Sequence, residues 1–130
     1  MKSALLVLAV ASLLAASSAY EWIGAFEAPK KAAVDAPFAV GFNATGTGYL
    51  EYPAIYAAQN GTWVAACLFP EERLNGSKVY SCNVSSPIAG NFSLRASIHT
   101  NVRANCTNVT YTPNPTDGCG DYKDRAVNIV

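Results

Sequence analysis

Seven asparagines of this chain stand in the pattern Asn-x-Ser/Thr, with a residue other than proline in the middle. That pattern is the acceptor for N-linked sugar, and an occupied acceptor lies on the surface of a secreted protein. Asn114 falls outside the pattern because Pro115 follows it. Some acceptors can stay empty, but we expect a heavily N-glycosylated surface, with sugar at Asn43, Asn60, Asn75, Asn83, Asn91, Asn105 and Asn108.

The four cysteines are the second set of residues with a defined chemistry. An even number of cysteines in an oxidising compartment indicates two disulfides. Three pairings are possible, and we favour Cys67–Cys82 and Cys106–Cys119, because each pair brackets a stretch rich in turn residues. The chain has no Cys-x-x-Cys motif and a single histidine, so the sequence predicts no metal site.

Few residues are suited to catalysis. His99 is the only histidine, it falls on the outward phase of its expected strand, and no Gly-x-Ser-x-Gly elbow accompanies it. Glu71 and Glu72 are adjacent and fit a turn, so they do not form the carboxylate pair of a glycosidase. The acidic stretch 117–124 does not have the spacing of a calcium loop, and a solvated turn tied by a disulfide explains it. The sequence therefore predicts a surface histidine, no cofactor and no enzymatic activity.

The aromatic residues allow two interpretations. Trp22, Trp63 and seven tyrosines offer rings that can stack on a sugar. Aromatic residues are also favoured in strands, where they fill cores and sheet faces. We expect most of them in the core, with a lectin-like surface as the alternative.

Residues 1–19 have the layout of a secretory signal peptide. Lys2 gives a positive start, residues 4–16 are almost all Ala, Leu and Val, and Ser17, Ser18 and Ala19 are small residues before a cleavage site. The apolar run is shorter than the roughly 20 residues that a membrane span needs, and no second apolar run follows at the other end. We expect a mature chain that begins at Tyr20, is secreted to the extracellular space and has no membrane span.

The mature chain alternates with a period of two, which is typical of half-buried strands. The clearest case is the segment 91–99, where Phe92, Leu94, Ala96 and Ile98 share one phase. Acceptors fall on the phase that the apolar residues leave free in this strand and two others, at Asn43, Asn83 and Asn91. The remaining alternation predicts strands near 20–26, 38–43, 50–57, 62–69, 80–84, 107–112 and 125–130.

Asn60-Gly61 and Asn75-Gly76 are typical of tight hairpin turns. Seven or eight short strands with regular turns, and no long amphipathic helix, predict an all-β chain folded as a single antiparallel β-sandwich with two disulfides. The segment 89–96 has a small residue and glycine before an alternating aromatic and aliphatic pair, and so resembles a strand of immunoglobulin-like domains. That resemblance covers roughly residues 34–112 and implies an immunoglobulin-like sandwich, without the Cys…Trp…Cys pattern of antibody domains and without a function.

Composition and the first mature residues bear on function. Only 14% of the residues are charged and the formal net charge is zero, so nucleic acid is not an expected partner. We expect an N-terminal strand and linker at 20–31 and the sandwich domain at 32–130. The apolar strand with Tyr20, Trp22, Ile23 and Phe26 can add to the sheet edge of a neighbour and build a filament, or fold back as the first strand of its own domain.

These observations predict a structural subunit of an extracellular coat, matrix or filament that associates with itself. The alternative is a soluble secreted effector, or a module that binds another extracellular protein or a glycan. The two differ in one measurable property, because only the structural subunit must self-associate.

Overall fold

The computed structural model of the protein describes residues 22–101, 106, 109–115 and 118–130. The signal segment 1–19, Tyr20 and the acceptors Asn105 and Asn108 lie outside the described residues. Within them no α-helix occurs, and so no helix that is long and apolar enough to cross a membrane. The all-β class is confirmed, with seven strands: β1 (Ile23–Glu27), β2 (Lys31–Ala32), β3 (Phe38–Gln59), β4 (Thr62–Leu68), β5 (Glu72–Val84), β6 (Gly90–Thr100) and β7 (Gly120–Ile129).

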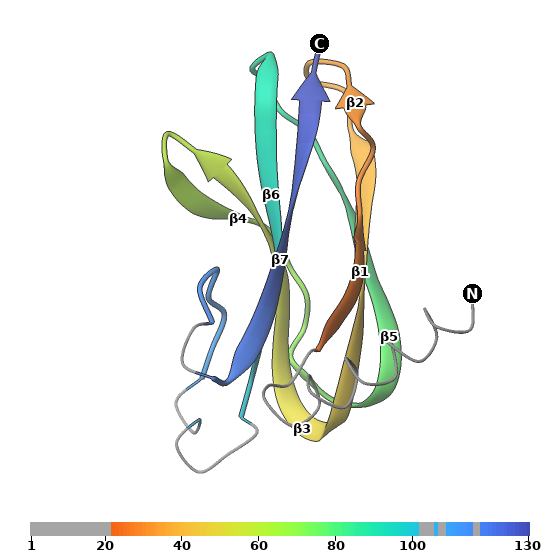
Figure 1. Ribbon diagram of the computed structural model, residues 1–130, viewed down its shortest axis with the longest axis vertical. Coiled ribbons are helices and arrows are strands. Elements are labelled where there is room, and N and C mark those ends of the chain that lie inside the picture. Colours follow the sequence, from red (N-terminus) through yellow and green to blue (C-terminus); the bar gives the residue numbers. More distant parts are fainter. Residues whose placement is uncertain (1–21, 102–105, 107–108, 116–117) are drawn as a thin grey trace, which may run out of the picture.

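The strands form one continuous sheet that curls into a half-barrel, rather than the two separate layers of a sandwich (Figure 1). Its order is β1-β3-β6-β7-β2, and β4 and β5 both pair with β3. The first half of β3 pairs with β1 and β5, and its second half pairs with β4 and β6. The long strand β3 therefore belongs to both walls of the half-barrel.

A disulfide shows how strongly β3 bends. Cys82 of β5 lies opposite Val40 and Cys67 of β4 lies opposite Ile55, 15 residues further along β3. A straight strand of that length spans about 50 Å, yet the Cα atoms of the bonded cysteines are 6.7 Å apart. The bend lies near Gly48, which has a positive φ, beside the bulge between Thr47 and Tyr49.

The core lies inside this curl. Phe42 of β3 is its centre: its ring stacks on Tyr80 of β5 with centroids 5.4 Å apart, and meets Phe26 of β1 edge-on at 6.4 Å. The phases predicted for three strands are confirmed, because the expected inward residues pack in or against this core. On β6 these residues are Phe92, Leu94, Ala96 and Ile98.

Three local predictions were wrong and one was confirmed. The segments 38–43 and 50–57 are parts of the single strand β3, and Asn75-Gly76 lies inside β5, opposite Thr47 and Gly46, instead of in a turn. The described residues of 107–112 are not a strand. The Asn60-Gly61 turn is confirmed, with the positive φ angles of 52° and 77° that such a turn requires.

The N-terminal strand pairs within its own sheet. β1 runs antiparallel to β3, and Trp22, Ile23 and Phe26 are buried in the core of the same chain. The expected linker also contains a strand, because β2 pairs in parallel with β7. In this structure the segment therefore takes the second of the two positions that the sequence left open.

Candidate functional site

The outer face of β6 carries a guanidinium group held from several sides. Arg95 lies between Tyr56 of β3 and Asp124 of β7 in the strand register. Its Nε and Nη2 donate to the two carboxylate oxygens of Asp124 at 2.6 and 2.8 Å. Its Nη1 donates to the Pro113 carbonyl oxygen at 3.1 Å and to Asn114 Oδ1 at 2.8 Å. The bond to Asp124 raises the pKa of Arg95, and the two-pronged contact fixes the plane of the group.

Two aromatic rings lie against this fixed guanidinium. The Arg95 Cζ atom is 4.5 Å from the ring centroid of Trp63 and 4.1 Å from that of Tyr122. Both distances are within the range of a cation–π interaction. We call Trp63, Arg95, Tyr122 and Asp124 the Arg95 cluster. The rings come from β4 and β7, so the cluster joins three strands of the outer face.

A shallow hollow of about 300 Å³ borders the cluster. It combines one aromatic ring with a hydroxyl, a carboxylate and a second guanidinium, and its lining residues are Trp63, Ser93, Asp124, Arg125 and Ala126. The hollow is the part of the cluster that is open at the surface.

Segment 109–115 lies over the other end of the same face. Ser97 Oγ donates to the Thr112 carbonyl oxygen at 2.5 Å, and His99 Nδ1 donates to that of Thr110 at 2.7 Å. Tyr111 sends its hydroxyl to the Phe69 carbonyl oxygen and meets Tyr52 edge-on at 5.2 Å. Three outward side chains of β6, counting Arg95, thus bind the main chain of this segment.

The prediction of a surface histidine was wrong for this reason. His99 has the outward phase that was expected, but it is only 8% exposed because segment 109–115 covers it. The hydrogen on Nδ1 is fixed by the carbonyl, which can only accept. His99 therefore anchors the covering segment, as does Ser97 beside it.

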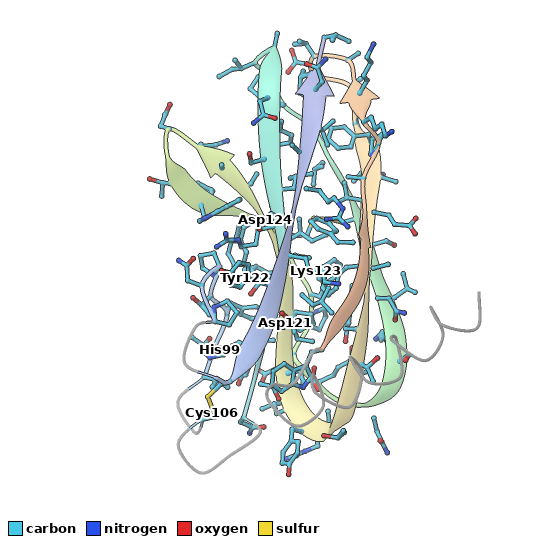
Figure 2. All side chains as sticks on the ribbon, in the orientation of Figure 1. His99, Cys106, Asp121, Tyr122, Lys123 and Asp124 are labelled. Carbon is cyan, nitrogen blue, oxygen red and sulfur yellow. A yellow bond between two sulfur atoms is a disulfide. The ribbon has the colours of Figure 1, made fainter. Side chains whose placement is uncertain are left out.

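The acidic stretch 117–124 was expected to be a solvated turn tied by a disulfide; the disulfide at Cys119 is present, but the stretch from Gly120 onward is a strand. The described part of 117–124 continues into the strand β7, where neighbouring side chains point to opposite sides. Asp121 Oδ2 accepts from the Ile23 main-chain N at 3.0 Å and Lys123 donates to the Gly24 carbonyl, both toward β1, whereas Asp124 binds Arg95 (Figure 2). In the part of the chain that the structure describes, no three His, Cys, Asp or Glu side chains gather as a metal site would need.

The two glutamates of the other acidic pair also separate. Glu72 opens β5 and accepts hydrogen bonds from Lys78 Nζ at 2.6 Å and Tyr80 Oη at 2.8 Å. The bond from Lys78, followed by that from Tyr80, lowers the pKa of Glu72. Glu71 precedes the strand and is exposed, so the two carboxylates do not share a cleft.

Both predicted disulfides are present with the favoured pairing, Cys67–Cys82 and Cys106–Cys119. The first joins β4 to β5. The second joins residue 106 to the start of β7, where the Cys119 carbonyl accepts from the Thr100 main-chain N at 2.7 Å. The connection between β6 and β7 is thereby tied at the end of the sheet where β7 begins (Figure 2), and both cysteines are buried.

The five described acceptors are all exposed. Asn43, Asn75 and Asn83 lie on β3 and β5, facing out, in register with Val79, Thr47 and Ala39. Two more lie at one end of the sheet, Asn60 in the β3–β4 turn and Asn91 at the start of β6. Exposure is what a glycan requires of its asparagine, and the sugar itself stays a prediction.

The sequence did not single out Arg95 or Tyr122. Their outward phase was visible, since Arg95 alternates with buried residues of β6. Which residues of β4 and β7 face Arg95 depends on the register between strands, and that register follows from pairings far apart in the chain. Trp63 was noted only as one aromatic residue among several.

Comparisons with known proteins concern the fold. The chain is similar to solved structures of the superoxide reductase (neelaredoxin) from Ignicoccus hospitalis, with 12% identity and a TM-score of 0.54 over 89% of this chain and 86% of that one. A variant of that protein gives 13% identity and the same TM-score, over 88% and 85% of the two chains. No family model matches the chain, and no curated protein matches its sequence. The likeness supports a β-rich fold and does not single out the immunoglobulin-like arrangement.

The prediction of no enzymatic activity is corrected by this likeness. It rested on the absence of a catalytic triad, a metal motif and a carboxylate pair from the sequence, whereas the structures that share the fold are named as reductases. At 12% identity the likeness carries the fold alone. The reductase activity is therefore a property of those proteins. What the residues of this chain can do follows from their own contacts.

Proposed function

We propose that the chain is a secreted, N-glycosylated module that binds an extracellular carbohydrate at the Arg95 cluster. The observation that carries the proposal is the stack of Trp63 and Tyr122 on Arg95, next to the hollow that Ser93, Asp124 and Arg125 also border. A sugar ring has apolar C–H faces and polar hydroxyl edges. An aromatic ring with charged donors and acceptors around it matches both.

The stiffness of the cluster supports binding. Ordering a side chain at an interface costs about 0.5–1.5 kcal/mol. Here Arg95 is already held by four hydrogen bonds, and its guanidinium holds both rings. These side chains have therefore lost their conformational freedom on folding, and a ligand that binds to Trp63 does not have to order them.

Three of the five described acceptors lie away from this face. Asn43, Asn75 and Asn83 are on the outer side of β3 and β5, on the other wall of the half-barrel from the cluster. Sugar attached at these three positions leaves Trp63 and Tyr122 accessible, whereas Asn91 lies on the same side of β6 as Ser93 of the hollow. Tyr122 is 40% exposed, which is enough for one side of its ring to be covered by a partner.

The test is a glycan array probed with the secreted full-length chain, followed by calorimetry with the best-binding glycan. Trp63→Ala is expected to lower the affinity at least about tenfold, which is about 1.4 kcal/mol. Tyr49→Ala is the control, because Tyr49 is an exposed aromatic residue that lies at the bend of β3, outside the Arg95 cluster. Thermal melting shows whether each variant is folded.

Two results would contradict the proposal. One is a folded wild-type chain that binds no glycan on the array. The other is a glycan whose affinity Trp63→Ala and Tyr49→Ala change equally, because the binding site would then lie elsewhere. If Trp63 instead binds a protein partner, this face would still be a binding site, but its ligand would not be a carbohydrate.

A further inference from the structure

Three surface hollows share a combination that the proposed function does not use. Each is lined both by an N-glycan acceptor and by an exposed aliphatic side chain. Asn43 shares its hollow with Val79, which is 68% exposed. Asn60 and Asn91 share theirs with Ile88, which is 73% exposed. The third hollow pairs Asn83 with Val64.

The geometry is most complete at Asn43. Asn43 and Val79 are direct cross-strand neighbours on β3 and β5, and cross-strand neighbours on one face lie about 5 Å apart. The Asn43 Nδ2 atom, which would carry the sugar, is 3.7 Å from the place where a Cβ of Gly24 would stand. Because Gly24 has no side chain, the space above β1 beside this nitrogen is open.

The groove beside Asn43 has a volume of about 600 Å³, within the range of ligand sites. Its floor is made mostly of small or apolar residues from three strands and the turn after β1, among them Ala25, Ala28, Pro29, Ala39 and Val79. An exposed aliphatic side chain next to such a floor keeps apolar surface in contact with water, which is unfavourable. A covering group would remove that contact.

We infer that the occupant is the chain's own sugar: the first residues of the Asn43 glycan lie in this groove against Val79. The Asn60 and Asn91 glycans cover Ile88 in the same way, and the Asn83 glycan covers Val64. The inference rests on the proposed N-glycosylation and gives it a structural role. N-acetylglucosamine has an acetyl methyl and apolar C–H faces for the groove, and hydroxyls that stay in water.

A tethered sugar is a better occupant than a free partner. The covalent bond turns packing into an intramolecular event with a high effective concentration, so a weak apolar contact is enough. Acceptors also border all three hollows, and a glycan rooted on the rim stands in the way of a protein surface. Exposed aliphatic residues that would favour aggregation are then shielded by the modification itself.

The experiment is a double-mutant cycle on the full-length chain secreted from a eukaryotic host. Mass spectrometry of glycopeptides first measures occupancy at Asn43. Thermal melting then compares the wild type, Asn43→Gln, Val79→Thr and the double variant. Threonine keeps the shape and strand preference of valine, so the substitution removes apolar contact with little other change.

We expect each single substitution to lower the melting temperature by a few degrees. Val79→Thr is expected to have little further effect once the Asn43 glycan is gone, because the two then act through one contact. Asn75→Gln is the control. Asn75 is an exposed acceptor of β5 outside these three hollows, and its removal is expected to add independently to Val79→Thr.

The outcomes distinguish failure of the glycosylation at Asn43 from failure of the packing against Val79. An empty Asn43 overturns the proposed glycosylation at this site, and the packing with it. An occupied Asn43 whose removal is additive with Val79→Thr overturns the packing alone. If Asn43→Gln is not secreted, enzymatic removal of the sugar from folded wild type and Val79→Thr gives the same comparison, with the same expected loss of coupling.

Discussion

Glu51 is a carboxyl group enclosed by the half-barrel near the bend of β3. It is 0% exposed, and neither of its carboxylate oxygens has a hydrogen-bond partner among the described residues. Gly46 makes room for it, since a Cβ there would overlap Glu51 Oε2 and the Leu74 carbonyl oxygen. Burial, and then the charge of Glu72 across the strand, raise the pKa of Glu51 to about 8. The folded chain therefore holds Glu51 as the neutral acid at neutral pH.

This pKa predicts a protein that is more stable in mild acid. The folded state holds a proton on Glu51 up to about pH 8, whereas the unfolded chain releases it near 4.5. The contribution of Glu51 to the free energy of unfolding is fully present below pH 4.5. It falls as the pH rises and is lost above about pH 8. The total change is on the order of 5 kcal/mol.

Urea unfolding at pH 5 and pH 9 checks this for the wild type and Glu51→Gln. The variant is expected to lose most of the difference between the two pH values, because glutamine does not ionise. Glu27→Gln, an exposed glutamate of β1, is the control and is expected to keep it. A wild-type chain that gains stability from pH 5 to pH 9 would show that Glu51 is ionised in the fold.

At the scale of the elements, β4 depends on its disulfide. β4 pairs with β3 alone among the described strands, and most of its side chains are exposed. In Figure 1 its hairpin stands away from the rest of the sheet. The Cys67–Cys82 bond connects it to β5 and closes the open side of the curl, next to Phe69, which packs on Tyr80 with centroids 5.2 Å apart.

Replacing both cysteines of this bond by alanine is expected to cost about 3 kcal/mol, from the loop of 15 residues that it closes. The loss is expected to be local as well, since β4 has little burial of its own to hold it. Hydrogen exchange of the main-chain amides of 62–68 should speed up well beyond the change in global stability. The Cys106→Ala/Cys119→Ala variant is the matched control, with a separation of 13 residues. Equal exchange in β4 in the two variants would contradict a local role.

The elements also show what alternation in the sequence could predict. Inward and outward phases were right in β3, β5 and β6, because one buried face imposes a period of two on each strand. The disulfide pairing was predicted from the turn residues that each pair of cysteines brackets, and it is the pairing observed. Gly76 has a φ of 97° but Asn75 does not have a positive φ, so the pair lacks the conformation of a hairpin turn and is part of the pairing between β5 and β3. The burial of His99 and the Arg95 cluster depend on which segments cross the face of β6, and no local pattern contains that information.

At the scale of the whole molecule, the two outer walls differ in chemistry. The wall of β3 and β5 carries three acceptors and small or hydroxyl side chains. The wall of β4, β6 and β7 carries the Arg95 cluster. Asn91, at the start of β6, is an acceptor on the second wall as well, so we expect covalent sugar on both walls and a sugar ligand on the second wall only. β1 is at the end of the strand order and pairs with β3 alone among the described strands, while its apolar side chains pack in the core of the same chain.

The position of β1 predicts a monomer. Phe26 is 1% exposed and meets Phe42 inside the same chain, so its apolar surface is already covered. Light scattering of the secreted chain over a wide range of concentrations should give the mass of one glycosylated chain.

Phe26→Ala is expected to destabilise that monomer by about 3–5 kcal/mol, the usual cost of emptying an aromatic core position. The matched substitution Val34→Ala removes an exposed side chain next to the C-terminal strand and is expected to leave stability nearly unchanged. Oligomers or filaments that Phe26→Ala dissociates into folded monomers would place β1 in a neighbouring chain instead, and would restore self-assembly as the function of this segment.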